Sequence, residues 1–399
     1  MSHKVVLITG GQGYLGLSIA KRIIDDTPKE TRLTIIITSR TFPNIKNAIK
    51  ELKAYVLKNH LDRPALVEFD YVTVDLADMV SVCAALRELE LRYAHIDTVV
   101  FNACLALYDG IDWVQSCVQT LQNPVEAFTY ARYKIQRPVK PTRDGMGSVF
   151  QANVFAPWFI LRRLTGPRQV SKDKLEVEKM ETPVLGSGSK VFWISSLTAD
   201  TMAKSPSEGG LDLDDIDLFN TPESYEASKR EIDLLHHATA QLLKDRYGVT
   251  SLLVQPGIFK STSFVPTLNV FAYVGMLLAF YLCRWLGSPY HNIDPWKAAN
   301  AVATLDATPN DQINLFTKYG SATDRRGREY VMKQVVPGLE QGFDEEEAQN
   351  SSAETGTGAG AGAGRRSAGE AYKLYLYVEA LYKVWEERLA KQVVERYLF

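Results

Sequence analysis

Residues 4–16, Lys4-Val5-Val6-Leu7-Ile8-Thr9-Gly10-Gly11-Gln12-Gly13-Tyr14-Leu15-Gly16, decide the fold of this chain. The apolar run at the start is typical of a buried parallel strand, and the residues after Gly16 continue as a helix to Ile24. A strand, a glycine-rich turn and a helix are the context in which a dinucleotide binds. Gly10 permits the tight turn, Gly13 lets the backbone approach a pyrophosphate, and Gly16 allows close packing of helix on strand. The alternative is an ordinary glycine-rich loop.

The end of the second predicted strand, Leu33 to Thr38, indicates which dinucleotide would bind. An acidic residue there would accept a hydrogen bond from the ribose 2′-hydroxyl of NAD, but this chain has Ser39-Arg40. A guanidinium suits the 2′-phosphate of NADP, so the sequence favours NADP as the cofactor. The alternative is that Arg40 is a plain surface charge.

Two further predicted strands end in polar residues. The third strand, residues 71–76, ends in Asp75-Leu76, and the fourth, residues 97–103, ends in Asn102-Ala103. Ligands of such sheets bind at the carboxyl ends of the strands. Asp75 is therefore expected either to accept from the adenine amine or to cap the helix that begins near Met79.

Tyr225 and Lys229 are four residues apart on a predicted helix, so both side chains lie on one face. An ammonium beside a phenol favours the phenolate and lowers the pKa of the phenol. A phenol tuned in this way can donate a proton to a carbonyl oxygen near neutral pH. The alternative is an exposed helix face, because this spacing often arises by chance.

Composition excludes several classes of protein. The chain has 399 residues, of which 46% are hydrophobic and 23% charged, as in a globular protein with a full core. Its formal net charge of −2 gives no reason to expect nucleic acid. The four cysteines show no metal or redox spacing and are expected to be reduced thiols on the cytosolic side. The N-terminus runs straight into a strand, so no signal peptide is expected.

These motifs resemble those of the short-chain dehydrogenase/reductases over roughly residues 3 to 262. That family has a Thr-Gly turn, an Asp-Leu pair, an Asn-Ala-Gly, a catalytic Asn, a Ser, Tyr-x-x-x-Lys and Pro-Gly in succession. Two positions depart from the pattern. Tyr14 replaces a glycine of the turn, which makes the glycine spacing nearer to that of the extended subfamily, and Cys104 replaces the glycine of Asn-Ala-Gly. The matching residues, in the same order, are Thr9-Gly10, Asp75-Leu76, Asn102-Ala103-Cys104, Asn153, Ser195-Ser196, Tyr225 with Lys229, and Pro256-Gly257.

The resemblance implies an α/β fold with a Rossmann-type doubly wound parallel sheet. It implies that Tyr225 transfers the proton and that Lys229 tunes Tyr225 and binds the nicotinamide ribose. Ser196 would hold the substrate oxygen, and Asn153 would hold a water that relays protons to the lysine. Dimers of this family often form through the helices that carry Asn153 and Tyr225. The expected cofactor-binding residues are Thr9, Gly10, Gly13, Leu15, Gly16, Arg40, Asp75, Leu76, Asn102, Ala103, Tyr225, Lys229, Pro256, Gly257, Ile258 and Ser261.

Several segments fall outside the family motifs. Residues 104–147 are expected to form one or two helices and a loop on the substrate side, and residues 170–188 a surface loop. No metal site is expected in the acidic loop before Tyr225, because no His or Cys accompanies its carboxylates. We expect a solvated loop there. The carboxylates are Asp212, Asp214, Asp215 and Asp217.

We expect one NADP-binding reductase domain over residues 1–343. A disordered low-complexity insert follows at 344–369, and an amphipathic helix at 370–399. The apolar stripe of that helix is expected to pack on the body or on a partner. Its members are Leu374, Val378, Leu381, Trp385, Leu389 and Val393.

The stretch from Ser261 to Cys283 has no charged residue, and Arg284 and Trp285 follow as an interfacial anchor would. A bilayer span needs about 20 apolar residues, and the strongly apolar part here is shorter. We therefore expect residues 264–286 to form a membrane-associated segment that dips into one leaflet beside the substrate entrance. A true span and a buried core or dimer helix are the alternatives.

This apolar segment, the long insert after Asn102 and the stretch Lys318-Tyr319-Gly320-Ser321-Ala322-Thr323 resemble the 3-keto-steroid reductases of sterol synthesis, the fungal ones above all. The resemblance implies NADPH-dependent reduction of a 3-keto sterol, such as zymosterone, to the 3β-alcohol after C-4 demethylation in ergosterol synthesis. It implies a place at the endoplasmic reticulum membrane or lipid droplets, with the catalytic domain in the cytosol. The implied partners are the C-4 methyl oxidase, the 4-carboxysterol decarboxylase and their scaffold.

Two other functions stay open at this point. The spacing of Gly13 and Gly16 suggests an extended-type enzyme that acts on a nucleotide sugar, which would have a polar pocket. The second is a non-catalytic NADP-binding scaffold within an assembly of sterol enzymes. The intact set of Ser196, Tyr225, Lys229 and Asn153 favours catalysis.

Overall fold

A parallel sheet with one antiparallel edge strand organises the computed structural model, which describes residues 2–62, 66–173, 176–180, 182–261, 268–339 and 361–398. Over these residues the sheet has eight strands in the order β14-β13-β10-β9-β4-β1-β2-β3, and only β14 runs antiparallel. This is the predicted Rossmann-type fold. The strands are β1 (His3–Ile8), β2 (Arg32–Ser39), β3 (Val67–Thr73), β4 (Thr98–Phe101), β9 (Lys190–Ile194), β10 (Thr250–Gln255), β13 (Lys318–Thr323) and β14 (Glu329–Gln334).

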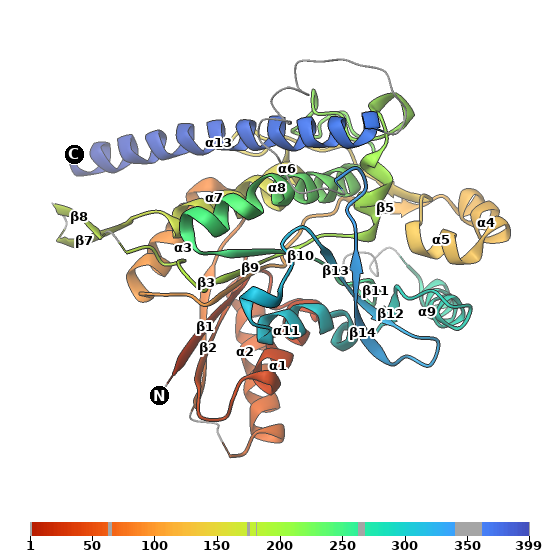
Figure 1. Cartoon of the computed structure of the whole chain (residues 1–399), viewed down its shortest axis with the longest axis horizontal. Helices are drawn as coiled ribbons and strands as arrows, with labels where there is room; N and C mark the ends of the chain where they lie inside the picture. The colour runs from red at the N-terminus through yellow and green to blue at the C-terminus, as the bar shows by residue number, and fades with distance from the viewer. Residues whose placement is uncertain are drawn as a thin grey trace.

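Helices cover both faces of the sheet, because the strands are apolar on both sides (Figure 1). One face packs on α1 (Tyr14–Asp26), α2 (Phe42–Asn59) and α11 (Asn300–Ala307). The other packs on α3 (Met79–Arg92), α7 (Ala156–Thr165) and α8 (Ser224–Tyr247). The sheet is therefore doubly wound, as predicted.

The third strand differs from its predicted position. It covers Val67–Thr73 rather than 71–76, so Asp75-Leu76 lies beyond its end. Asp78 caps α3, since its carboxylate accepts from the amides of Val80 and Ser81. The capping alternative for Asp75 is therefore wrong, and its carboxylate accepts from the Ala77 amide instead.

The insert after β4 projects from the sheet as a hairpin and two helices. Its elements are β5 (Tyr108–Ile111), α4 (Trp113–Gln122), α5 (Pro124–Tyr130) and β6 (Lys134–Gln136). They lie beside α9 (Val270–Trp285) at one end of the molecule (Figure 1). The expected surface loop at 170–188 instead contains paired strands, β7 (Arg168–Asp173) and β8 (Glu176–Met180).

The apolar segment forms α9, and most of its side chains are not covered. Only Phe280 and Cys283 are buried, whereas Phe271 is 89% exposed. Within the described residues no helix is both long and apolar enough to cross a bilayer. The first part of the predicted segment, residues 264–267, lies outside the described residues.

The C-terminal helix α13 (Ala361–Leu398) packs along α7 and α8 (Figure 1). Leu374, Val378 and Trp385 are buried in the core, so this part of the predicted stripe packs on the body, whereas the side chains of Leu389 and Val393 lie outside what the structure describes. The helix begins at Ala361, so residues 361–369 are helical and not part of a disordered insert as expected. Residues 344–360 of that insert lie outside the described residues. α13 thus covers the helices through which dimers of the family often form.

Short elements complete the chain. A helical turn, α6 (Ser148–Phe150), leads through a π-helical segment at Gln151–Phe155 into α7. β11 (Ile258–Phe259) pairs with β12 (His291–Ile293) after the Pro-Gly turn. α10 (Pro295–Ala298) begins after Asp294, whose carboxylate accepts from the Trp296 amide.

Candidate active site

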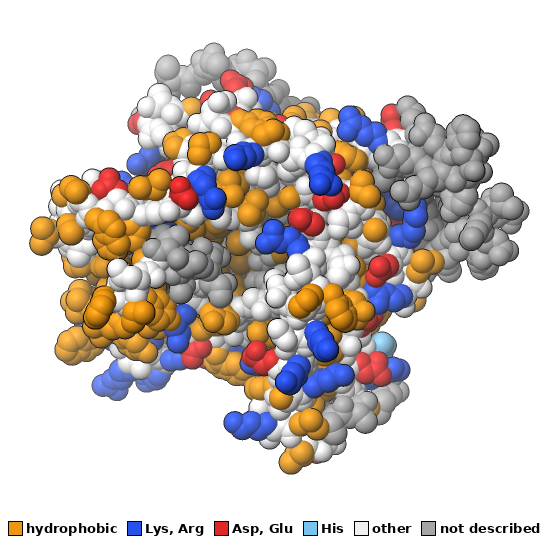
Figure 2. Space-filling view, turned by 180° about the vertical axis from the view of Figure 1, so that it is seen from behind, with side chains coloured by type: hydrophobic (Ala, Val, Ile, Leu, Met, Phe, Trp, Pro, Cys, Tyr) orange, Lys and Arg blue, Asp and Glu red, His pale blue; other side chains and the backbone are white. Residues whose placement is uncertain are grey.

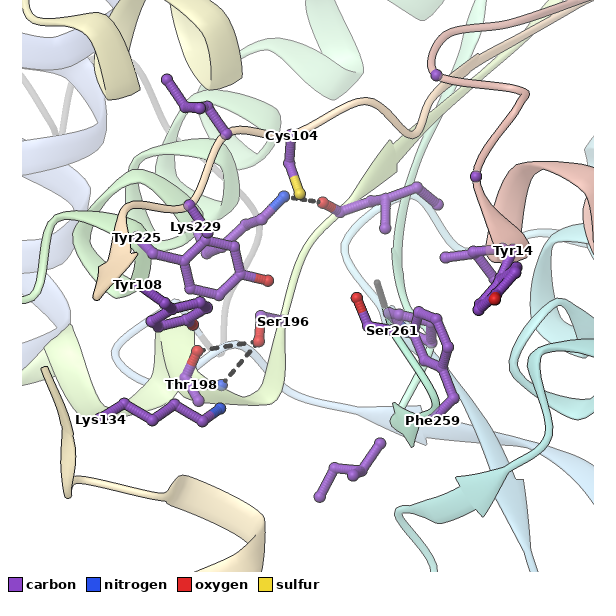
Figure 3. Close-up of a pocket in the computed structure, with 18 of the residues that line it drawn as sticks. Tyr14, Cys104, Tyr108, Lys134, Ser196, Thr198, Tyr225, Lys229, Phe259 and Ser261 are labelled. Carbon is purple, nitrogen blue, oxygen red and sulfur yellow. Dashed lines mark hydrogen bonds between the residues drawn. The ribbon is translucent and has the colours of Figure 1, made fainter. Parts of the chain in front are cut away.

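A cavity of about 630 Å³ runs along the carboxyl ends of the strands, from the glycine turn to α8 and on between α4, α5 and α9. Tyr225, Lys229 and Ser196 lie on one side of it, with Tyr14 and Phe259 opposite (Figure 3). The cavity thus lies at the carboxyl ends of the strands, where the sequence predicted that a ligand binds.

The glycine turn is shaped by close contacts that only glycine permits. Gly10 has a φ of +61°, and a Cβ there would lie 3.0 Å from Cα of Ala103. A Cβ on Gly16 would lie 2.7 Å from Cα of Gly11, so Gly16 packs against the turn itself rather than on the strand. The turn brings backbone amides and the N-terminus of α1 to the cavity, an arrangement that suits a pyrophosphate.

Nearly all the predicted cofactor residues line the cavity. Thr9 and Gly16 are the exceptions, and the Thr9 hydroxyl instead accepts from the Ala103 amide at 3.0 Å. The Asn102 amide donates to the Thr9 carbonyl at 3.0 Å and so ties β4 to the turn. The lining residues are Gly10, Gly13, Leu15, Arg40, Asp75, Leu76, Asn102, Ala103, Tyr225, Lys229, Pro256, Gly257, Ile258 and Ser261.

Tyr225, Lys229 and Ser196 converge on one side of the cavity (Figure 3). The Lys229 ammonium lies 5.6 Å from the centre of the Tyr225 ring and donates to the Ile194 carbonyl at 2.6 Å. The Ser196 hydroxyl lies 2.9 Å from that of Thr198. Both serines line the cavity, but the hydroxyl of the neighbouring Ser195 donates to the buried Asp233 carboxylate, so the Ser196 hydroxyl is the one left to bind a ligand.

The electrostatics of this pair differ from the sequence-based expectation. Burial raises the pKa of Tyr225 well above its ordinary value, against a smaller lowering by the Ser196 hydrogen bond. Burial likewise lowers the pKa of Lys229. A neighbouring ammonium was expected to lower the pKa of Tyr225, but burial raises this pKa instead. Tyr225 is therefore a neutral phenol at pH 7, which is the form that can donate a proton.

Asn153 does not line the cavity, although it lies one layer behind it. Its amide donates to the Leu105 carbonyl at 2.9 Å and to the Ser228 hydroxyl at 3.0 Å, and its oxygen accepts from the Leu105 amide at 2.6 Å. The residue sits in the π-helical segment, which is frequent at functional sites. Asn153 thus joins the chain after β4 to α8.

A buried ion pair behind the site was missed in the sequence. The Lys318 ammonium on β13 lies 2.8 Å from Asp233 and donates to the Ser196 carbonyl at 2.9 Å. It also lies 3.1 Å from Asp200. Burial works against its charge, but Asp233 and Asp200 raise the pKa of Lys318 above its ordinary value. Lys318 therefore remains an ammonium that fixes the backbone of Ser196.

The insert supplies a second set of missed residues. The Gln136 side-chain oxygen on β6 accepts from the Tyr225 amide at 3.0 Å and from the Ser224 hydroxyl at 3.1 Å. The Tyr108 ring on β5 lies 5.8 Å from that of Tyr225. Burial lowers the pKa of Lys134, whose ammonium lies 5.1 Å from the centre of the Tyr108 ring. These residues hold the start of α8 against the insert, and no motif marks them.

The acidic loop before Tyr225 is held by the chain around it. Asp217 accepts from the Gly147 amide and from the Tyr377 hydroxyl, and Asp214 pairs with Lys373 on α13. Asp215 accepts from the amides of Phe219 and Asn220. Among the described residues, no cluster of His, Cys, Asp and Glu has the arrangement of a metal site.

The half of the cavity beyond Tyr225 is mostly apolar. It is walled by α4, α5 and α9, and its lining suits a hydrophobic substrate. This lining does not suit the sugar of a nucleotide sugar. The residues are Leu105, Ile111, Trp113, Phe128, Tyr133, Leu268, Ala272, Met276 and Phe280.

Comparison with known proteins identifies relatives over nearly the whole chain. The family model described as KR domain matches residues 4–113. The chain is 38% identical over 390 residues to the 3-keto-steroid reductase ERG27 of Candida albicans, covering 98% of this chain and 96% of that protein. It is 44% identical over 326 residues to the 3-keto-steroid reductase of Eremothecium gossypii, covering 81% of this chain and 85% of that protein.

Solved structures bear on the fold. The RhlG/NADP active-site complex of Pseudomonas aeruginosa matches with a TM-score of 0.50 at 16% sequence identity, covering 82% of this chain and 97% of that one. The likeness confirms the short-chain dehydrogenase/reductase fold.

Proposed function

This chain belongs to the 3-keto-steroid reductases, and we propose that it uses NADPH to reduce the 3-keto group of a sterol intermediate to the 3β-hydroxyl group in ergosterol synthesis. The observation that carries the proposal is that Tyr225, Lys229 and Ser196 meet between the half of the cavity that the glycine turn lines and the half that is mostly apolar. A dinucleotide fits the first half and a sterol the second.

The residues present fit NADPH. The turn around Gly10 and Gly13 lines the cavity at the N-terminus of α1, which suits a pyrophosphate, and Arg40 lines the cavity wall where the 2′-phosphate would lie. Lys229 would bind the nicotinamide ribose. When bound there, NADPH supplies the hydride that the carbonyl carbon accepts.

The protein's own residues handle the carbonyl oxygen. Ser196 holds it by a hydrogen bond, and Tyr225 donates the phenolic proton as the C–O bond becomes single. Lys229 stabilises the negative charge left on the phenolate oxygen. Asn153, behind Lys229, supports the water through which the proton is replaced.

The substrate is a sterol ketone such as zymosterone, formed after removal of the C-4 methyl groups. We place the enzyme at the endoplasmic reticulum membrane or lipid droplets with its catalytic domain in the cytosol. There α9 would rest on the membrane surface beside the C-4 methyl oxidase, the 4-carboxysterol decarboxylase and their scaffold. α13 covers the helix pair expected to form a dimer, so we propose that self-association does not use that face.

The test is NADPH oxidation by the purified, detergent-solubilised full chain with zymosterone, with NADH in parallel. Turnover with NADPH alone is expected, and mass spectrometry should find the 3β-alcohol. Tight NADPH binding without turnover of any sterol ketone would contradict the proposal and favour a scaffold role.

A further inference from the structure

We propose that α4 and α9 form the two sides of a substrate entrance that rests on an anionic phospholipid bilayer. The sterol then passes from the bilayer into the cavity without crossing water. This inference rests on the proposed function, because it assumes that the ligand of the cavity is a sterol. It adds the insert helix α4 and a basic cluster to the apolar segment predicted from the sequence.

α9 is apolar on both of its faces. Ala272, Gly275 and Met276 face the cavity, whereas Phe271 and Leu278 point away from it and are exposed. A helix that is hydrophobic all round is stable when apolar surroundings lie on every side. The cavity supplies one such side, and a bilayer would supply the other.

α4, like α9, lines the cavity on one side and has exposed apolar side chains on the other. Trp113 and Ser116 line the cavity, and none of the residues of α4 is buried. Val114, Val118 and Leu121 do not line the cavity and are exposed, Leu121 to 87%. The entrance therefore has exposed apolar side chains on both of its sides.

The insert and α9 are joined into one body. The ring of Phe128 on α5 lies 6.4 Å from that of Phe280 on α9, edge to face. The Cys283 thiol donates to the Pro124 carbonyl at 3.6 Å. Hydrophobic side chains gather at this end of the molecule (Figure 2). An apolar surface of this kind marks an interaction site.

Basic side chains surround the end of α9. A Cβ on Gly327 would lie 3.2 Å from the Arg284 guanidinium, and a Cβ on Gly287 would lie 3.1 Å from that of Arg325. Lys297 donates to the Gly327 carbonyl at 2.5 Å. Arg326 and Arg328 are exposed on the same turn, where Asp324 is the acid that pairs with Arg328. We call Arg284, Lys297, Arg325, Arg326 and Arg328 the basic cluster.

This cluster decides which partner fits. Anionic phospholipid headgroups complement it, while the apolar side chains of α4 and α9 reach below them. Trp285, exposed beside Arg284, has the amphipathic ring that suits the interface. A symmetric pair of copies joined through the same surface would bring two basic clusters together, so a second copy is the poorer occupant.

The experiment measures vesicle flotation and turnover of the full chain together. The vesicles are phosphatidylcholine with or without phosphatidylserine, and the sterol ketone is supplied either in the vesicles or in cyclodextrin. The variant Val114→Ser/Val118→Ser/Leu121→Ser removes the outer side of α4 without changing the cavity wall. The control Leu57→Ser/Leu91→Ser removes exposed leucines elsewhere.

We expect the α4 variant to lose about tenfold or more in vesicle affinity and in turnover of the vesicle-held ketone. It should keep its turnover of the cyclodextrin-held ketone, and the control should match the wild type in both. Arg325→Gln/Arg326→Gln should remove the preference for phosphatidylserine.

Three outcomes would overturn the proposal. They are unchanged vesicle binding by the α4 variant, equal loss of turnover with both forms of the ketone, and a wild-type dimer that this variant dissociates. If the wild type binds vesicles but reduces neither form of the ketone, the proposed function is wrong. The inference that a sterol enters between α4 and α9 is then wrong as well.

Discussion

The Lys318 ammonium lies 2.8 Å from the Asp233 carboxylate, and neither side chain is exposed to solvent. The two residues come from β13 and α8, and they meet directly behind the Ser195-Ser196 pair. The pair therefore links β13, the last parallel strand of the sheet, to α8 and to the Ser195-Ser196 segment.

Removing one member of this pair should destabilise the protein strongly. Lys318→Met leaves Asp233 buried without its cation, and such a loss costs about 3 to 5 kcal/mol in free energy of unfolding. The double variant Lys318→Met/Asp233→Leu should recover part of that loss, as urea unfolding would show. Lys373→Met, at an exposed pair with Asp214, is the control and should leave stability nearly unchanged. Additive losses in the double variant would contradict the pairing.

Tyr225→Phe should abolish turnover and leave NADPH binding intact. The ring and its contact with Tyr108 remain, but the proton donor is gone, so kcat should fall by about 10²-fold to 10⁴-fold. Fluorescence titration with NADPH and steady-state kinetics measure the two effects. Thr198→Val, which removes the hydroxyl beside Ser196, should act far more weakly. Substantial turnover by Tyr225→Phe would mean that another residue is the acid.

Arg40→Ala should reduce the preference for NADPH over NADH. A hydrogen bond to a charged group contributes about 1.5 to 3 kcal/mol, so the dissociation constant for NADPH should rise at least about tenfold. The constant for NADH should stay the same, because NADH lacks the 2′-phosphate. Calorimetric titration with NADPH and with NADH measures the two dissociation constants. An equal rise in both constants would show that Arg40 does not bind the 2′-phosphate.

Cys104 should make the enzyme sensitive to thiol alkylation. Its side chain is exposed on the cavity wall with the sulfur beside the Lys229 ammonium (Figure 3). In a Cys117→Ser background, N-ethylmaleimide should inactivate the enzyme, and bound NADPH should slow the inactivation. Cys104→Gly should stay active and resist the reagent. Inactivation of that variant at the same rate would place the sensitive thiol elsewhere.

The buried His236 should reduce stability in acid. Burial lowers the pKa of His236 from 6.5 to about 4, so the folded protein holds it neutral while the unfolded chain protonates it below pH 6.5. This shift contributes up to about 3 kcal/mol to the free energy of unfolding above pH 6.5, and the contribution is lost as the pH falls towards 4. The difference in unfolding free energy between wild type and His236→Gln should therefore shrink over this range. A difference that does not vary with pH would show that His236 does not titrate on unfolding.

Local patterns were enough to predict the sheet and most of the cavity wall. The glycine turn, Arg40, Asn102 and Tyr225 each follow or begin a strongly patterned element, so their places follow from the topology. The sequence position of Thr9 and Gly16 wrongly predicted that they line the cavity. Thr9 instead bonds to Ala103 and Gly16 packs against Gly11, so both stabilise the turn on the side away from the cavity.

Properties that depend on distant parts of the chain could not be predicted. Lys318 and Asp233 are 85 residues apart, and no local sequence pattern predicts that their side chains are in contact. The pKa of Tyr225 was misjudged because the sequence shows the neighbouring Lys229 but not the burial that outweighs it. The third strand was placed too late because the alternation of buried apolar residues, Val72, Val74 and Leu76, continues beyond its end at Thr73.

The position of α13 also has a consequence for how the protein is made. Arg230 and Glu231, fully buried on α8, are covered on one side by this helix, and the Arg230 guanidinium donates to Ser367. α13 comes after α7 and α8 in the chain, so the ribosome synthesises these two helices before the helix that covers them. α8 must then remain with charged and apolar side chains uncovered until α13 has been synthesised. A chaperone that shields α7 and α8 during this interval would favour correct folding of the nascent chain.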